Sequence, residues 1–391
     1  MSGCPVCEAV RHEPVWVLEG VPILPMLRLD ESPQPDHFAT LEVVRRQACG
    51  HLYNRSYDAA LADRMYRGEL LSNVPVHVSM SKYLEEIAQW IGRPHYAGRR
   101  VIEIGAGSGH LARILAQEAG HLWIFEPCRG LRPEMLPEPH ITLINEPFSA
   151  ALIEEPADLI VCRQVLEHLA DPFGFLRQIR AALRETGTCY LEVPRAEYIE
   201  EQRAVFDLHY AHVQYFHESN LVRLASRAGF EPVRRWWLKG GHDIGMLLRA
   251  ARPTRAEPSV SGPAVVRDLH DRLEDRRART RAWLASLEGP LSLYGAISQG
   301  VAFLHAFQTD CRFAVVADDN PEYAGYALYS AAQRVPVVSA SNEMVRRSTH
   351  VIIAAYLHDT LITTRLRGEL GYAGQVVSLR EPVSALSEVS R

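Results

Sequence analysis

The stretch VIEIGAGSGH, residues 101–110, decides the fold of this chain. An apolar run typical of a buried strand leads through Glu103 into Gly105, Gly107 and Gly109, and the following residues have the apolar spacing of a helix. Alternating glycines let a turn bend tightly, and they let a ligand approach the main chain without meeting a Cβ atom. The stretch therefore predicts a strand, a ligand-binding turn and a helix, which together begin an α/β domain.

Length and charge limit what the remaining residues can do. A chain of 391 residues with 47% apolar residues is long enough for two or three globular domains. Its formal net charge of −5 gives no general attraction to nucleic acid or to an anionic membrane. No apolar run approaches the roughly 18 residues of a membrane span, and MSGCPVCEAVRHEP lacks the features of a secretory signal. We expect a cytoplasmic monomer or homodimer, and the odd count of seven cysteines argues against a disulfide scaffold.

Composition divides the chain into four parts. Residues 1–72 are irregular and rich in Cys and Tyr, and residues 73–250 alternate strand and helix patterns. Residues 251–288 hold a Pro- and Ser-rich linker and a charged connector helix, and residues 289–391 begin a second alternating unit. Alternation of this kind predicts two Rossmann-like α/β domains in tandem, each with a parallel sheet.

The glycine spacing indicates the cofactor. A dinucleotide fingerprint needs glycine at its first, third and sixth positions, and the sixth position here is His110. The Gly-x-Gly-x-Gly spacing, with Glu103 two residues earlier, instead resembles motif I of class I S-adenosylmethionine-dependent methyltransferases. This resemblance implies that Glu103 faces the α-ammonium group of the cofactor.

Residues at the ends of the later strands extend the cofactor site. Glu126, seventeen residues beyond Gly109, is placed to accept hydrogen bonds from both ribose hydroxyls. Asn145 and Glu146 are candidates for the adenine edge, with a solvated strand end as the alternative. Arg163 and Gln164 are expected to line the methionine end.

Three segments carry a more specific resemblance. CRQVLEHLADPFGFLRQI, DLHYAHVQYFHESNLVRLASRAGF and LYGAISQGVAFL with VADDNP resemble the three-domain C-methyltransferases that act on nucleotide-activated deoxysugars. With the cysteine module, the resemblance spans nearly the whole chain and implies a small-molecule acceptor, a keto sugar linked to a nucleotide. The chain departs from the family at Ala211, where the family has Glu, and at His209, where it has Tyr; Tyr210 is displaced by one position.

In the family reaction, a base removes a proton next to a ketone, and the resulting carbon nucleophile attacks the sulfonium methyl group. His212 is the predicted base, because histidine titrates near neutral pH. His209 or Tyr210 is expected to hydrogen-bond the oxygen where charge develops, and on a helix 209 and 212 share a face. A buried structural imidazole is the alternative for His212, while Glu167 with His168 forms either an acid–base pair or a structural cap. O- or N-methylation of another metabolite and a non-catalytic binding protein remain the alternative functions.

The first module suggests a metal site and a lid. Cys4 and Cys7 with QACGH resemble a zinc knuckle, but Arg46 stands where the resemblance implies a further thiolate. Cys4, Cys7, Cys49 and His51 are therefore the predicted zinc ligands, with a metal-free module as the alternative. Tyr57 and Tyr66 are expected to cover the cofactor or simply to pack between modules.

The second α/β unit has a weaker glycine pattern. Ile297 stands between Gly295 and Gly300 and would obstruct a pyrophosphate, so the pattern argues against NAD. The helix that begins near Ser298 can receive an anion. The resemblance implies that the nucleotide part of the acceptor lies near Asp318, Asp319 or Asn320, and a purely structural domain is the alternative.

Overall fold

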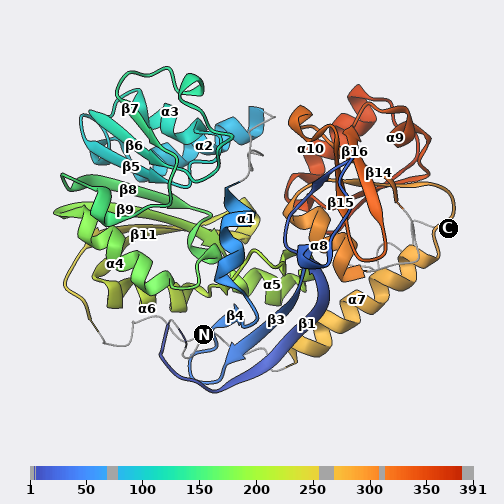
Figure 1. The fold of residues 1–391 in the computed structure, drawn as a ribbon, viewed down its shortest axis with the longest axis horizontal. Helices are drawn as coiled ribbons and strands as arrows, with labels where there is room; N and C mark the ends of the chain where they lie inside the picture. Colours follow the sequence, from blue (N-terminus) through green and yellow to red (C-terminus); the bar gives the residue numbers. More distant parts are fainter. Residues whose placement is uncertain (1–3, 5, 68–77, 255–267, 308–312, 381–391) are drawn as a thin grey trace.

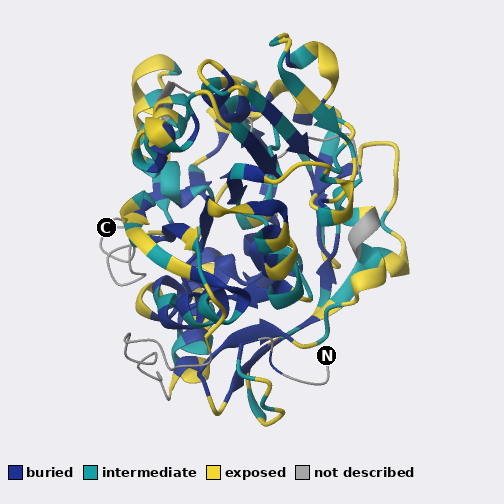
Figure 2. Ribbon diagram, turned by 90° about the vertical axis from the view of Figure 1, so that its left-hand side faces the viewer, coloured by how far each residue is buried: buried dark blue, intermediate teal, exposed yellow. Residues whose placement is uncertain are grey.

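A computed structural model describes residues 4, 6–67, 78–254, 268–307 and 313–380, and it confirms the α/β fold class (Figure 1). Two α/β units lie side by side, and a smaller antiparallel sheet connects them. Buried residues follow the strands, whereas the outer helices and turns carry most of the exposed ones (Figure 2). Among the described residues, every helix is too short or too polar to cross a lipid bilayer.

The central sheet has the order β11-β12-β9-β8-β5-β6-β7. Its strands are β5 (Arg100–Ile104), β6 (His121–Phe125), β7 (Ile141–Ile144), β8 (Ala157–Arg163), β9 (Leu183–Pro194), β11 (Phe230–Leu238) and β12 (Asp243–Ala250). The strands β5 to β9 are parallel, and β12 and β11 complete the sheet in an antiparallel hairpin. The carboxyl ends of the five parallel strands therefore meet at one edge, where open α/β sheets bind ligands.

Helices cover both faces of this sheet. They are α2 (Val78–Ile91), α3 (His110–Ala116), α4 (Pro172–Ala182) and α6 (Glu218–Ala228), with α5 (Ala196–Gln202) nearby. Val101 packs in one apolar cluster with α2 and α3, whereas Ile102 and Ile104 pack in another with α4 and α6. Successive side chains of a strand point to opposite faces, so a strand that is covered on both faces needs apolar residues on each. In β5 these are Val101 on one face and Ile102 and Ile104 on the other.

The carboxyl-terminal sheet has the order β18-β17-β13-β14-β16-β15-β2. Its strands are β13 (Leu291–Tyr294), β14 (Phe313–Asp318), β15 (Tyr326–Tyr329), β16 (Arg334–Ser339), β17 (His350–Ile353), β18 (Gln375–Ser378) and β2 (Leu27–Arg28). Its helices are α8 (Ser298–Phe307), α9 (Glu343–Arg347) and α10 (Asp359–Thr364), and α7 (Leu269–Ala285) is the charged connector. The predicted linker lies mostly outside the described residues.

The amino-terminal module is more regular than its sequence suggests. It contains β1 (His12–Pro22), β3 (Phe38–Arg46), β4 (Leu52–Asn54) and the short helix α1 (Ala62–Tyr66). The prediction of irregular structure is wrong here because β1 carries two register shifts against β3, and such bulges disrupt the alternation of side chains.

Two short strands cross the predicted domain boundaries. β10 (Gln214–Tyr215), from the central domain, pairs with β4, and β2 of the first module pairs with β15 at the edge of the carboxyl-terminal sheet. The amino-terminal module is thus bonded to both α/β units.

Candidate active site

The glycine turn after β5 is as tight as its sequence predicts. Gly105, Gly107 and Gly109 have φ angles of 71°, 56° and 72°, a region that favours glycine. A Cβ atom at Gly105 would lie 2.3 Å from Cγ2 of Val165, in the loop after β8. The turn and this loop therefore face each other at the carboxyl edge of the sheet.

Glu126 connects the second strand to this turn. Its carboxylate accepts hydrogen bonds from the N–H groups of Gly107 at 2.7 Å and Cys128 at 2.9 Å. Burial raises the pKa of Glu126, and both N–H groups oppose that shift. The carboxylate therefore lies beside the turn, where the ribose prediction requires it.

The side-chain amide of Asn145 is bonded to the loop that follows β6. Its side-chain amide donates to the carbonyls of Glu126 and Leu131, both at 3.2 Å, and to that of Cys128 at 3.4 Å. These bonds use the amide N–H groups to hold the loop that follows β6, and the adenine contact stays a prediction. Glu146 forms an exposed ion pair with Arg67.

Glu103 is a buried acid that lacks a partner on one oxygen. Its side chain is 3% exposed, and Oε2 has no hydrogen-bond partner among the described residues. Burial raises the pKa of Glu103 to about 8, against the positive charge of Arg163. An unpaired buried carboxylate is costly, and a cation placed beside it would favour its ionised form.

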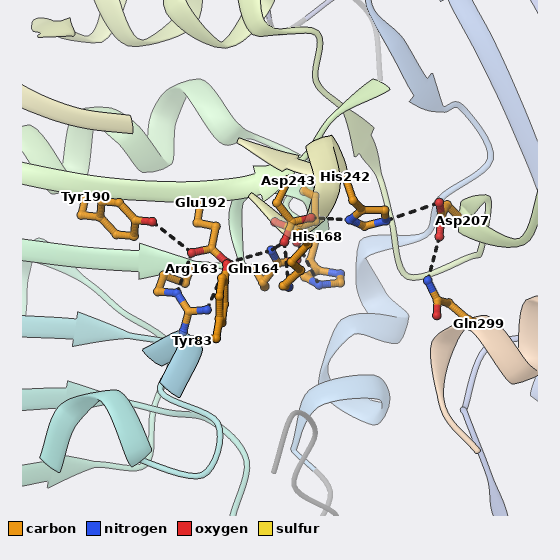
Figure 3. Close-up of polar contacts among 12 residues, drawn as sticks. Tyr83, Arg163, Gln164, His168, Tyr190, Glu192, Asp207, His242, Asp243 and Gln299 are labelled. Atoms are coloured by element: carbon orange, nitrogen blue, oxygen red, sulfur yellow. Dashed lines mark hydrogen bonds and ion pairs between the residues drawn. The ribbon is translucent and has the colours of Figure 1, made fainter. Parts of the chain in front are cut away.

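Arg163 and Gln164 lie at the end of β8, but acids of the neighbouring strands hold their polar groups. Arg163 makes two bonds to Glu192, at 2.8 and 3.0 Å, and Gln164 donates to Asp243 at 2.9 Å. Tyr83 also donates to Glu192, at 2.9 Å (Figure 3). The sequence analysis missed Glu192 and Asp243, although each lies at the end of a central strand.

The polar network continues to the carboxyl-terminal domain. His242 lies between Asp243, at 2.5 Å, and Asp207, at 3.4 Å (Figure 3). Burial alone would lower the pKa of His242, but the two carboxylates raise it to about 10. Asp207 also accepts hydrogen bonds from Tyr356 at 2.6 Å and Gln299 at 3.1 Å, which belong to the last domain. The ring of His242 is therefore an imidazolium that connects the two domains.

Three histidines gather beside this network. The ring centroids of His209 and His212 are 3.8 Å apart, and those of His212 and His168 are 5.0 Å apart. The helix expected over 209–212 is absent there; these residues form a turn, in which the N–H of His212 donates to the carbonyl of His209. Burial lowers the pKa of His209 to about 3 and that of His168 to about 4, and it lowers the pKa of His212 too. The cluster is therefore neutral at physiological pH.

Two tyrosines attach the amino-terminal module to the cluster. The ring of Tyr66 meets that of His168 edge-on at 5.5 Å, and its hydroxyl donates to the carbonyl of Ala211 at 3.4 Å. The hydroxyl of Tyr210 instead accepts from the N–H of Asp58 at 3.0 Å, and its ring packs on Tyr57. Tyr66 thus covers the histidines, whereas Tyr210 is held by the module and not by an acceptor oxygen.

Three of the four predicted zinc ligands come together. The sulfur atoms of Cys4, Cys7 and Cys49 lie within 4.8 Å of one another, and those of Cys4 and Cys49 are 3.8 Å apart. Tetrahedral Zn²⁺ with bonds of about 2.3 Å separates two sulfurs by about 3.8 Å, so the thiol cluster fits this ion. His51 lies outside this group of ligand atoms. Its Nε2 donates to Gln214 at 2.8 Å, and its buried Nδ1 has no hydrogen-bond partner among the described residues.

Arg46 explains the missing fourth ligand. It is 2% exposed, its guanidinium donates to the carbonyl of Val10 at 2.5 Å, and it lies over the ring of Tyr53. A buried cation therefore stands next to the turn that carries Cys49, where the family resemblance implied another thiolate.

Comparison with known proteins identifies the central domain. Residues 76–235 match a sequence profile described as "Methyltransferase domain". Ubiquinone biosynthesis O-methyltransferase of Xanthomonas campestris pv. campestris is 24% identical over 144 residues, which cover 34% of this chain. The match spans 57% of that relative, little more than half of its length.

Solved structures match this chain at low identity and low TM-score. Magnesium protoporphyrin IX methyltransferase from Synechocystis, with bound S-adenosylhomocysteine, has a TM-score of 0.37 and 14% identity, covering 44% of this chain and 84% of its own. An S-adenosylmethionine-dependent methyltransferase from Aquifex aeolicus has a TM-score of 0.36 and 15% identity, covering 44% and 93%. The matched profile, the strand order and the acid-flanked glycine turn agree, and residues 76–235 form a class I S-adenosylmethionine-dependent methyltransferase domain.

Proposed function

We propose that this chain transfers a methyl group from S-adenosylmethionine to a small-molecule acceptor bound at the histidine cluster of His168, His209 and His212. The buried carboxylate of Glu103 carries this proposal, because it lies next to the glycine turn with one oxygen unpartnered. The α-ammonium group of the cofactor would supply the missing charge. Glu126, at the end of the adjacent strand, accepts one N–H group on each oxygen, and the remaining lone pairs would accept from the ribose hydroxyls.

The favoured acceptor is a nucleotide-linked keto sugar that is methylated on carbon. A neutral imidazole of the 209–212 turn takes the proton next to the ketone, and the electron pair left on carbon attacks the methyl group. The carbon–methyl bond forms as the methyl–sulfur bond breaks, which releases S-adenosylhomocysteine. His209 and His212 are unprotonated, as a base must be, but the burial that lowers their pKa also weakens them as bases, so the expectation that histidine titrates near neutral pH does not hold for them.

Methylation on oxygen is the second candidate. Ala211 removes the carboxylate that the sugar-modifying family places before its histidine, and the curated relative from Xanthomonas campestris is named an O-methyltransferase. A hydroxyl acceptor also loses its proton to a neutral imidazole, so the same cluster serves both reactions.

Calorimetric titration with S-adenosylhomocysteine tests the cofactor site first. We expect binding in the micromolar range, and its absence would leave only a non-catalytic role for the fold. Carbon-13 NMR of products formed from methyl-labelled cofactor and a panel of nucleotide sugars then locates the new methyl group. A new methyl on oxygen in every product would replace carbon methylation by the second candidate.

We also propose that the thiol cluster of Cys4, Cys7 and Cys49 holds Zn²⁺ as a structural ion. The sulfur separations support this assignment. Metal analysis of protein purified without added zinc should find one ion that Cys7→Ser removes. Equal zinc contents in the two proteins would end this proposal.

A further inference from the structure

Glu167 is a second buried acid, and no hydrogen bond to its carboxylate forms among the described residues. The side chain is 1% exposed, and neither Oε1 nor Oε2 takes part in a hydrogen bond there. Its position is fixed by the main chain, because the N–H of Val213 donates to the carbonyl of Glu167 at 2.8 Å. A carboxylate is removed from water at high cost, so a native structure that buries one pairs it with a cation or keeps it protonated.

Two imidazoles face this carboxylate. One ligand atom from each of Glu167, His168 and His212 lies within 4.8 Å of the others, and the distance from Oε1 of Glu167 to Nε2 of His168 is 3.9 Å. The Nδ1–H of His168 donates to the carbonyl of Ala211 at 2.8 Å, which leaves a lone pair on Nε2. Metal-bound histidines make this kind of outer hydrogen bond, because it fixes both tautomer and ring orientation.

We propose that Glu167, His168 and His212 bind a divalent first-row transition ion, of the class of Zn²⁺, Fe²⁺ and Co²⁺. Two nitrogens and one carboxylate oxygen suit these ions and leave coordination positions open. Ligand atoms about 2.1 Å from one ion lie about 3 to 4 Å apart, so the widest pair here need close by only about 1 Å. This site is separate from the thiol cluster, which belongs to the amino-terminal module.

The site lies on the acceptor side of the cofactor. Val165, two residues before Glu167, contacts the first glycine of the cofactor turn, and Tyr66 covers His168 from the other side. An open coordination position there would take an oxygen of the acceptor, a step that rests on the proposed function. Coordination by His212 would leave His209, the neighbouring imidazole, to accept the proton.

Cobalt binding tests the site without any turnover assay. Metal-stripped Cys7→Ser protein, which lacks the complete thiol cluster, is titrated with Co²⁺ and followed by calorimetry and by visible d–d absorption. We expect one ion per chain, with no thiolate charge-transfer absorption. Adding Glu167→Gln or His212→Gln should weaken binding at least a hundredfold, whereas His121→Gln, which removes an imidazole of β6 outside the cluster, should leave it unchanged.

Two results would overturn the site. One is Cys7→Ser protein that binds no Co²⁺, and the other is full Co²⁺ binding after either Glu167→Gln or His212→Gln. Far-ultraviolet circular dichroism checks that each variant is folded. If Glu167→Gln does not fold, the site is tested with His212→Gln, because His212 is only half-buried. S-adenosylhomocysteine titration of the same samples separates the proposals: cofactor binding without Co²⁺ binding rejects only the metal site, and Co²⁺ binding without cofactor binding rejects only the proposed function.

Discussion

The two α/β units contain glycine turns that are built alike and used differently. In the methyltransferase domain, Glu126 at the end of β6 accepts from the turn at Gly107 and from Cys128. In the last domain, Asp318 at the end of β14 accepts from the turn at Ala296, at 2.8 Å, and from Asn320, at 2.9 Å. Each carboxylate thus accepts one hydrogen bond from the glycine turn of its domain and one from the N–H group two residues after the acid.

The difference lies in what fills each turn. Glu103 stands two residues before Gly105, and the residue in the same position before Gly295 is Leu293. The second turn therefore has no acid at this position that could pair with a cation. A Cβ atom at Gly300 would lie 2.0 Å from the carbonyl oxygen of Gly295, so this glycine lets the helix pack on the turn.

Protein groups also occupy the surroundings of the second turn. Gln299 of α8 reaches Asp207 of the methyltransferase domain, and Asp319 is held by Tyr294 at 2.7 Å and by Arg365 at 2.5 Å. The predicted nucleotide contacts of Asp318, Asp319 and Asn320 gain no support from this arrangement. The unpaired buried acid, rather than the glycines, is therefore what distinguishes the first turn from the second.

The largest expected effect is on cofactor affinity, and it distinguishes Glu126 from Asp318. Glu126→Ala should weaken S-adenosylhomocysteine binding about a hundredfold or more, because two charge-assisted hydrogen bonds of about 1.5 to 3 kcal/mol each are lost. Asp318→Ala, the matched change in the other turn, should alter the affinity by less than about twofold. Calorimetry measures both, and equal losses would show that the two turns do not differ in use.

The glycines give the next largest effect, on stability. Gly300→Ala should lower the free energy of unfolding by about 2 to 3 kcal/mol, because the new methyl group overlaps a main-chain carbonyl. Urea denaturation measures this loss. Cofactor affinity of the folded variant should stay at the wild-type value, and a large loss of affinity would mean that the second turn supports the cofactor site.

Local patterns predicted the strand, the turn and the positions of Glu103 and Glu126 at the strand ends, because each is encoded within a few consecutive residues. Contacts made across the chain were missed. His242 and Asp243 are consecutive, but their network depends on Asp207, which is 35 residues earlier in the chain, and no local pattern pairs it with them. The contact between His51 and Gln214, which is distant in sequence, was also missed. The strand β10 that carries Gln214 is only two residues long, too short for a pattern to show.

The link between the two units gives a smaller effect. Asp207→Asn keeps the shape of the side chain but removes one of the two charges that hold His242 as an imidazolium. The free energy of unfolding at pH 7 should fall by about 1 to 2 kcal/mol. Because the folded pKa of His242 is raised to about 10, its contribution is complete below about pH 6 and is lost as the pH rises through 10. The difference between variant and wild type should therefore be larger at pH 7 than above pH 10, where only the bonds from Tyr356 and Gln299 still contribute.

The smallest expected effect concerns the ionisation of Glu103, the buried acid that has no counterpart before the second turn. With a pKa of about 8, Glu103 is protonated in most free molecules at pH 7, and a bound ammonium group favours the carboxylate. Cofactor binding should therefore release about one proton at pH 7 and tighten up to about tenfold between pH 7 and pH 9. The stability of the free protein has the opposite trend: a raised folded pKa contributes stability at low pH, and this is lost as the pH rises through 8.

Calorimetry in two buffers of different ionisation enthalpy counts the protons. Glu103→Gln should release none from this position, and the titration of the ligand itself cancels between the two proteins. Equal proton release in both proteins would mean that Glu103 is already ionised in the free protein. The unpaired acid would then not explain why the turn binds the cofactor.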